Sequence, residues 1–394
     1  MDEKYDPLNS LKARLGEAPG RIAEAKSQGK KVVGYFGPYV PEELILAAGM
    51  QPLHLSFGGD AEAAAAGDEF LTSENCAFSR SCLGYRKLAK NSYFTAVDAV
   101  CVPYSCESMK KVQEYWEKYF GVPSIPLGVP QTHNRLRTKP QAEEYFKEEL
   151  KLLQKRLEAV SGQLVKERDL HQSIALCNSI REKLWILFEY PIDGRSPIEW
   201  RQVFQILNAG YLLDRNIFNH ELETIINELE NQGWEQNPHD ERARLMIFGS
   251  TIGAGDNKVL DIVRDAGGNI VADGTCTGSM FARKKVRMPG VLGDPIDLLT
   301  ERYLYNFTCS FMTDLQIRVN NALKVARDYQ VHGMIYYALR HCDTSRADYK
   351  YVQDALYNEL SVPTLLIETD YASDDTGIIK EQVENFIKRI EGQV

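Results

Sequence analysis

The chain has 394 residues, a net charge of −9, 44% hydrophobic residues and 26% charged residues. This length favours two domains over one, and the composition is that of an ordinary folded globular protein. The negative charge argues against non-specific binding to nucleic acid or to an anionic membrane, since both need a basic surface. The N-terminus is polar and no later apolar stretch is long enough for a membrane span, so we expect a cytoplasmic protein.

The first part of the chain alternates between strand and helix patterns. An apolar run over residues 30–37 ends in glycine and is followed by an amphipathic segment over residues 44–49, which predicts a strand, a loop and a helix. Further strands are expected at Pro52–Phe57, Ala99–Tyr104 and Ser124–Val129, with a helix at Met109–Tyr119. This alternation predicts a parallel sheet with helical crossovers.

From about residue 141 the character changes to long charged and apolar runs at helical spacing, and strand patterns return near residue 240. The later strands are expected at Leu245–Ser250, Gly268–Asp273, Val331–Leu339 and Val362–Ile367. We therefore predict an α/β protein with two similar Rossmann-like or flavodoxin-like parallel-sheet domains. Residues 1–140, which include an N-terminal helical segment, form the first domain, 141–239 a helical connector and 240–394 the second domain.

The second half repeats the layout of the first. The strand before Cys106, the helix after it and the next Val-Pro strand are matched around Cys342. A repeat of this length indicates a duplicated domain and not a short-period solenoid. Because ligands of open parallel sheets bind beyond the carboxyl ends of the strands, the cysteines near those ends become candidates for a shared site.

Eight cysteines in a chain of this kind favour metal or redox chemistry over a disulfide framework, although buried thiols are the plain alternative. Cys101, inside a strand, and Cys177, on the apolar side of a helix, are expected to be core thiols. The other six are expected in loops or at helix starts on one rim: Cys76, Cys82, Cys106, Cys276, Cys309 and Cys342. Their spacing is not that of a ferredoxin, so any cluster would be assembled across both halves.

Several segments, in the same order along nearly the whole chain, resemble the 2-hydroxyacyl-CoA dehydratase and benzoyl-CoA reductase family. The resemblance is carried by Gly34–Met50, Glu74–Cys82, Ser105–Lys111, Cys276–Ser279 and His341–Asp343. It implies that Cys76, Cys106 and Cys342 hold a [4Fe–4S] cluster in the cleft between the two domains. The chain is most similar to the double-cubane cluster branch, which implies that Cys82, Cys276 and Cys309 hold a second cubane of an [8Fe–9S] cluster.

The resemblance also implies a function and partners. We expect an oxygen-sensitive homodimeric reductase that receives low-potential electrons from an ATP-hydrolysing activator with its own iron–sulfur cluster and reduces a small molecule. The sequence contains no Gly-x-x-x-x-Gly-Lys-Ser/Thr motif, so ATP would be hydrolysed by the activator. The alternatives are the [4Fe–4S] catalytic subunit of a 2-hydroxyacyl-CoA dehydratase, a non-catalytic electron carrier, and a protein whose cysteines bind no metal.

Two further residues are candidates for proton transfer. Glu43 lies at a predicted helix start, where a carboxylate also stabilises the helix dipole. His341 precedes Cys342 and is expected either to relay a proton to the site or to serve as a capping or core residue.

Overall fold

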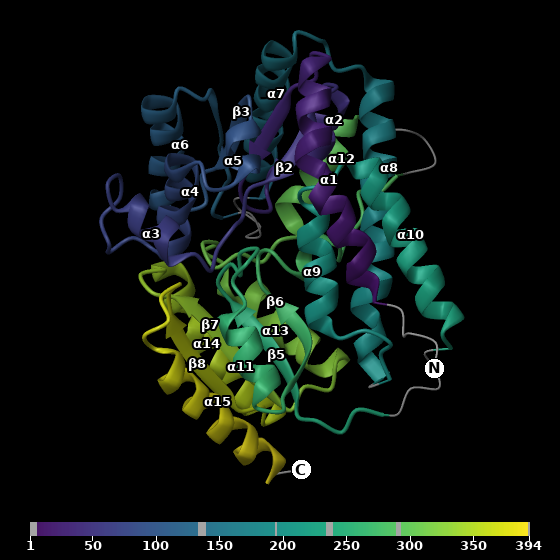
Figure 1. Cartoon of the computed structure of the whole chain (residues 1–394). Helices are drawn as coiled ribbons and strands as arrows, with labels where there is room; N and C mark the ends of the chain where they lie inside the picture. Colours follow the sequence, from purple (N-terminus) through teal and green to yellow (C-terminus); the bar gives the residue numbers. More distant parts are fainter. Residues whose placement is uncertain (1–5, 133–138, 194, 234–238, 289–292, 393–394) are drawn as a thin grey trace.

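The computed structural model describes residues 6–132, 139–193, 195–233, 239–288 and 293–392. They form two α/β domains, one above the other in Figure 1, with helices of the connector along one side. Each domain has a four-stranded sheet, in the order β2-β1-β3-β4 and β6-β5-β7-β8, and every strand pair is parallel. The identical strand orders confirm the predicted α/β fold with two similar domains.

The elements follow one another as helix and strand in both domains. The first domain contains α1 (Pro7–Ser27), β1 (Val32–Tyr35), α2 (Glu42–Ala47), β2 (Gln51–His54), α3 (Ala61–Gly67), α4 (Ala77–Leu88), α5 (Ser92–Ala96), β3 (Ala99–Pro103), α6 (Glu107–Phe120) and β4 (Ser124–Leu127). The connecting helices are α7 (Lys139–Ser161), α8 (Glu167–Glu189), η1 (Tyr190–Asp193), α9 (Trp200–Gly210) and α10 (Arg215–Asn231). The second domain contains β5 (Arg244–Gly249), α11 (Lys258–Asp265), β6 (Asn269–Gly274), η3 (Ser279–Phe281), α12 (Pro295–Tyr305), α13 (Leu315–Asp328), β7 (Gly333–Leu339), α14 (Asp343–Leu360), β8 (Thr364–Thr369) and α15 (Thr376–Glu391).

All eight predicted strands are present, with ends that differ by a few residues. Strands β1, β5 and β7 are buried along their whole length, as expected for parallel strands with helices on both faces of the sheet. Strand β2 ends earlier than predicted, at His54, because the chain after it leaves the sheet and pairs with the other domain.

This pairing joins the loops that follow β2 and β5. The Ala254 amide donates to the Ser56 carbonyl at 2.8 Å, and the Gly58 amide donates to the Ala254 carbonyl at 3.0 Å. A Cβ at Gly253 would lie only 2.6 Å from the Gly58 nitrogen, so a side chain at this position would block the approach. The short Gly-Ala-Gly sequence at 253–255 therefore allows two backbones to meet between the domains.

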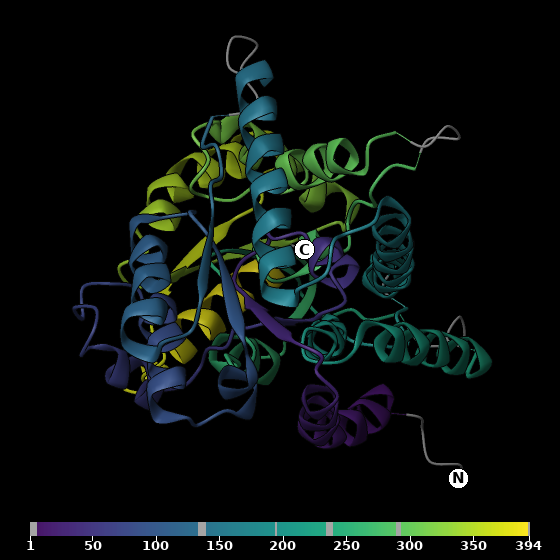
Figure 2. The ribbon, with the colours of Figure 1, turned by 90° about the horizontal axis from the view of Figure 1, so that it is seen from above.

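The connecting helices make the two domains share one hydrophobic core. A continuous cluster of buried side chains includes Val32 of β1, Ile180 of α8, Leu207 of α9 and Leu245 of β5. Helix α1 packs on α9 and α10 and lies at the outer edge of the molecule (Figure 2). The relative position of the two sheets is thus fixed by packing as well as by the backbone pairing. The predicted domain limits at 140 and 240 stay predictions.

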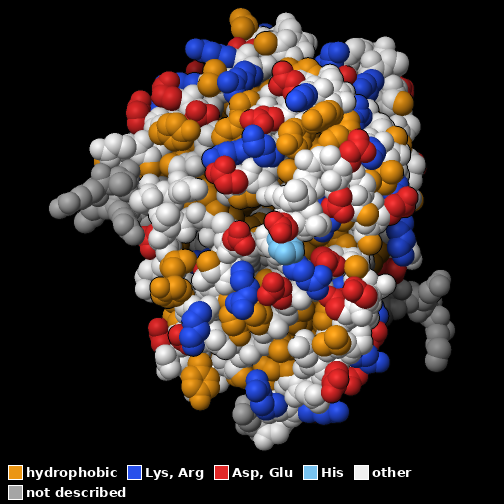
Figure 3. Space-filling model, turned by 90° about the vertical axis from the view of Figure 1, so that its left-hand side faces the viewer, with side chains coloured by type: hydrophobic (Ala, Val, Ile, Leu, Met, Phe, Trp, Pro, Cys, Tyr) orange, Lys and Arg blue, Asp and Glu red, His pale blue; other side chains and the backbone are white. Residues whose placement is uncertain are grey.

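The side of the molecule drawn in Figure 3 is neither uniformly acidic nor uniformly basic. Acidic and basic side chains are interspersed there over both domains, and the surface is hollowed at the waist between them. Within the described ranges, no helix combines the length and the apolar character that crossing a membrane requires.

Helices α3 and α4 approach each other closely at Gly84, so a side chain there should destabilise the fold. A Cβ at Gly84 would lie 1.7 Å from the Ala63 carbonyl oxygen, whereas a Cβ at Gly20 in α1 would meet nothing within 4 Å. We expect Gly84→Ala to lower the free energy of unfolding by about 1–3 kcal/mol. Gly20→Ala, the control, should raise it by about 0.5–1 kcal/mol. Urea unfolding measures both, and wild-type stability of Gly84→Ala would contradict the close packing.

Candidate functional site

Five cysteines line one cavity between the two sheets. The cavity has a volume of about 100 Å³. Its wall is formed by residues that follow β1, β2, β3, β5, β6 and β7, by the start of α4 and by the loop after α12. The thiols on the wall belong to Cys76, Cys106, Cys276, Cys309 and Cys342. The carboxyl ends of both sheets therefore face one space, as the position rule for open parallel sheets predicts.

Three of these cysteines begin helices. Cys76 is the N-cap of α4, Cys106 the N-cap of α6 and Cys342 the N-cap of α14. The positive end of a helix dipole favours a thiolate over a thiol, so this position suits a cysteine that is to bind a metal. Cys106 and Cys342 follow the equivalent strands β3 and β7, as the internal repeat indicated.

Burial disfavours the charged thiolate form of these cysteines and so opposes the effect of the helix dipoles as long as no metal is bound. It raises the pKa of Cys106 to about 12 and that of Cys342 to about 11, and the nearby Cys76 adds to both shifts. Hydroxyl groups lie beside two of the sulfurs, with Ser79 Oγ 3.5 Å from Cys76 Sγ and Thr344 Oγ1 3.8 Å from Cys342 Sγ. With raised pKa values, Cys106 and Cys342 favour the neutral thiol without a metal, and metal binding would release their protons.

The other two cysteines form a close pair. Cys276 follows β6, Cys309 lies in the loop between α12 and α13, and their sulfur atoms are 3.7 Å apart. The Cys276 thiol donates to Cys309, which lowers the pKa of Cys309 to about 7 and holds the pKa of Cys276 well above its usual value. The pair therefore loses its first proton more readily than two separate thiols would.

A buried arginine and a tyrosine complete the surroundings of this pair. Their mutual hydrogen bond and burial have the largest effects on the pKa of the two cysteines. The positive charge of Arg318 has a smaller effect and favours the thiolate form of both. Tyr39 is fully buried, and this burial raises the pKa of its phenol. The charges of Cys309 and Cys276 raise it further. The sequence did not single out Arg318 or Tyr39, because no short motif links either residue to the cysteines.

The structure places the sixth predicted ligand differently. Cys82 does not begin a helix or lie in a loop; it sits inside α4, is 1% exposed and is packed in the hydrophobic core. It is absent from the cavity wall, although its thiol is close enough to Cys76 and Cys106 for their charges to raise its pKa further after burial. Cys101 and Cys177 are also buried in the interior, where core thiols were expected.

Neither predicted proton donor lies on the cavity wall. Glu43 is fully buried and binds Arg181 Nη2 at 2.6 Å and the Tyr303 hydroxyl at 2.7 Å. His341 is exposed and has a left-handed backbone, with φ of 63°, immediately before Cys342. Glu43 thus takes part in a structural ion pair, and the catalytic roles of both residues stay predictions.

A second buried ion pair lies beside the first. Glu42 accepts from Arg215 Nε at 2.8 Å and from the Tyr35 hydroxyl at 3.0 Å. His54 packs edge-on against Tyr35 and stacks on Tyr211 with ring centroids 4.2 Å apart. These groups form a polar layer inside the first domain, and each charge has an opposite charge in contact, as burial requires.

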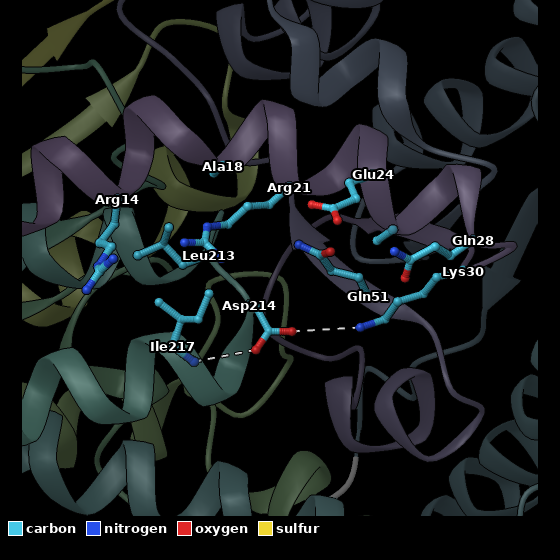
Figure 4. A pocket seen from close by; sticks show the side chains of 11 residues that line it. Arg14, Ala18, Arg21, Glu24, Gln28, Lys30, Gln51, Leu213, Asp214 and Ile217 are labelled. Atoms are coloured by element: carbon cyan, nitrogen blue, oxygen red, sulfur yellow. Dashed lines mark hydrogen bonds and ion pairs between the residues drawn. The ribbon is translucent and has the colours of Figure 1, made fainter.

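A larger groove lies elsewhere but lacks reactive groups. It encloses about 290 Å³ between α1 and the start of α10, and Figure 4 shows its side chains pointing into the space between the helices. Its cations are paired with carboxylates, for example Arg14 with Glu221 at 2.8 Å and Lys30 with Asp214 at 3.8 Å. We therefore place the chemistry at the smaller cysteine cavity.

The donor set of the cysteine cavity fits an iron–sulfur group. Within the described residues, no three His, Cys, Asp or Glu side chains meet closely enough to bind a single metal ion. In an iron–sulfur cluster each thiolate binds a different iron atom, so thiols distributed around a cavity are suitable ligands. Thiolate sulfur is also the soft donor that such clusters use.

The chain is similar to one protein family and to several known proteins. The sequence model of the family "2-hydroxyglutaryl-CoA dehydratase, D-component" matches residues 38–390. The chain is similar to the putative dehydratase subunit YjiM of Escherichia coli K12, with 26% identity over 94% of each chain. It is also similar to the (R)-phenyllactyl-CoA dehydratase beta subunit of Clostridium sporogenes, with 24% identity over 87% of each chain. One of the subunits of benzoyl-CoA reductase from Thauera aromatica is 24% identical over 92% of this chain and 91% of its own.

The buried imidazole next to the Glu42 ion pair should make stability depend on pH. Burial lowers the pKa of His54 from 6.5 to about 3, so this group contributes stability fully above pH 6.5 and loses it as the pH falls towards 3. His54→Phe keeps an aromatic ring but binds no proton. Between pH 7 and pH 5 we expect the wild type to lose about 2 kcal/mol more unfolding free energy than the variant.

Urea unfolding at the two pH values measures this difference. Replacement of the exposed His220 by Gln is the matched control and should leave the pH dependence unchanged. Equal losses in the wild type and His54→Phe would contradict a neutral buried imidazole.

Proposed function

The chain belongs to the 2-hydroxyglutaryl-CoA dehydratase D-component family, and on that premise we propose that its cysteine cavity holds an iron–sulfur cluster for low-potential reduction of a small molecule. The observation that carries the proposal is the convergence of five thiols from both domains on one cavity. Three of them begin helices and two form a close pair beside a buried guanidinium.

We further propose the double-cubane form of the cluster. In this assignment Cys76, Cys106 and Cys342 hold one cubane, and Cys82, Cys276 and Cys309 hold the other. Five thiols on the wall are more than three ligands of one cubane require, which favours the larger cluster. Cys82 would have to reach the cavity from its buried position in α4, and this makes it the decisive residue of the ligand set.

The chain's own residues would hold the group. Helix N-termini would stabilise the thiolate ligands Cys76, Cys106 and Cys342, and Arg318 would do so at the loop of Cys309. The cluster, when bound, would supply one-electron chemistry at low potential.

The electrons and the substrate are also part of the proposal. We propose that a separate ATP-hydrolysing protein with its own iron–sulfur cluster delivers the electrons and that the chain works as a homodimer. Several relatives are named as subunits of dehydratases, so a [4Fe–4S] dehydratase subunit is the alternative function.

Iron and acid-labile sulfide per chain, measured on protein prepared without oxygen, test the proposal. We expect about eight irons in the wild type and about four in Cys309→Ser, because loss of a ligand should remove one cubane. Cys177→Ala, which removes a buried thiol away from the cavity, is the control and should keep the wild-type content.

Other outcomes lead to different conclusions. About four irons in the wild type, with no loss in Cys309→Ser, would exclude the double cubane and favour the dehydratase alternative. No iron after anaerobic reconstitution would contradict the cluster itself.

A further inference from the structure

One buried arginine contacts three segments that form the second domain's share of the cavity wall. Arg318 lies on α13 and is 2% exposed. Its Nη1 donates to the carbonyl of Thr308 at 2.6 Å, directly before Cys309. Its Nη2 donates to the carbonyl of Gly249 at 3.2 Å, where β5 ends and the wall residue Ser250 follows.

The third segment is the helix that begins at Cys342. Arg318 Nε forms an ion pair with Asp348 on α14, and both side chains are almost completely buried. The Tyr336 hydroxyl donates to Asp348 and lies 2.7 Å from the Ser345 carbonyl, one turn after Cys342. A single guanidinium thus connects the loop of Cys309 with the first turns of the helix that carries Cys342.

A buried arginine–aspartate pair is an expensive way to fill a place in the core. Taking a guanidinium and a carboxylate out of water is expensive, and apolar side chains of similar volume often fill such a place without loss of stability. Arginine is the side chain that can hold several acceptors at once through its planar fork. At this place it also sets a fixed positive charge at the peptide directly before Cys309.

The guanidinium and its carboxylate lie differently with respect to the cysteine pair. Arg318 donates to the carbonyl directly before Cys309, whereas Asp348 lies on α14 and contacts Arg318 and Tyr336, so the cation is the charge that contacts the loop of Cys309. The first-domain cysteines Cys76 and Cys106 instead begin helices α4 and α6, whose dipoles place a partial positive charge at each of them. The two parts of the cavity are therefore electrostatically unequal.

We propose that Arg318 is the positioning residue of the Cys276–Cys309 side of the cavity and that its charge makes the iron held there the first to be reduced. Addition of an electron makes a cluster more negative, so a nearby fixed cation stabilises the reduced form and raises its midpoint potential. This inference rests on the proposed function, because it requires an iron–sulfur group in the cavity.

Reduction potentials of two single variants test the charge. Arg318→Gln removes the cation and should shift the first midpoint potential of the anaerobically loaded protein to a more negative value. Asp348→Asn removes the opposing anion, leaves Arg318 in place and should shift the same potential to a more positive value. Loosening of the fold alone does not predict opposite shifts.

Two further variants separate charge from structure. Arg318→Lys keeps the charge and should return the potential close to the wild-type value, with less iron retained because its ammonium cannot reproduce the fork. Arg302→Gln removes another buried arginine, which bonds the carbonyls of Lys284 and Phe281, and should leave the potential unchanged. If Arg318→Gln does not fold, the shift of Asp348→Asn to a more positive potential still decides, because an unchanged potential in that variant would overturn the proposal.

The results distinguish this inference from the function on which it rests. Wild-type protein without iron would contradict the proposed function. Wild-type protein with iron, and Arg318→Gln and Asp348→Asn variants whose potentials do not move or move in the same direction, would overturn only the role of Arg318. A shift in Arg302→Gln as large as that in Arg318→Gln would overturn it as well.

Discussion

The site depends on one constraint, which is that the carboxyl ends of two parallel sheets face each other across a single gap. Parallel strands place all their carboxyl ends on one edge, and the helices that follow begin there. Backbone pairing between the loops at Ser56 and Ala254, together with a core shared through the connecting helices, holds the two edges together. Thiols that are far apart in sequence reach the same cavity because four of the five follow a strand or begin a helix, and Cys309 is brought there by the loop between α12 and α13.

Much of this arrangement could be predicted from sequence. The strands appear as compact apolar runs because both faces of each sheet are covered, and the repeat placed Cys106 and Cys342 at equivalent strand ends. The cysteines that directly follow predicted strands, Cys106, Cys276 and Cys342, accordingly lie on the wall. The prediction that Cys82 lies in a loop or at a helix start was wrong. Nothing in its segment shows that the helix begins at Cys76, so that Cys82, six residues later, lies inside it.

Other parts of the site depend on contacts that no local pattern records. Glu43 was a candidate for proton transfer because of its helix start, but the three-dimensional structure supplies Arg181 and Tyr303 as buried partners. Arg318 carried no sequence signal, since its acceptors come from strand β5, the loop before Cys309 and helix α14. The buried arginines here have different surroundings: Arg215 and Arg181 are neutralised by Glu42 and Glu43, whereas Arg318 also donates to the peptide directly before Cys309.

The central claim is that thiols of both domains hold one iron–sulfur group between them. Anomalous diffraction at the iron absorption edge, from crystals grown without oxygen, tests it most directly. The account predicts iron peaks in the cavity, with ligands from the first domain, such as Cys106, and from the second, such as Cys342. Iron bound by cysteines of one domain alone, or a cavity without iron in protein that retains it in solution, would contradict the account.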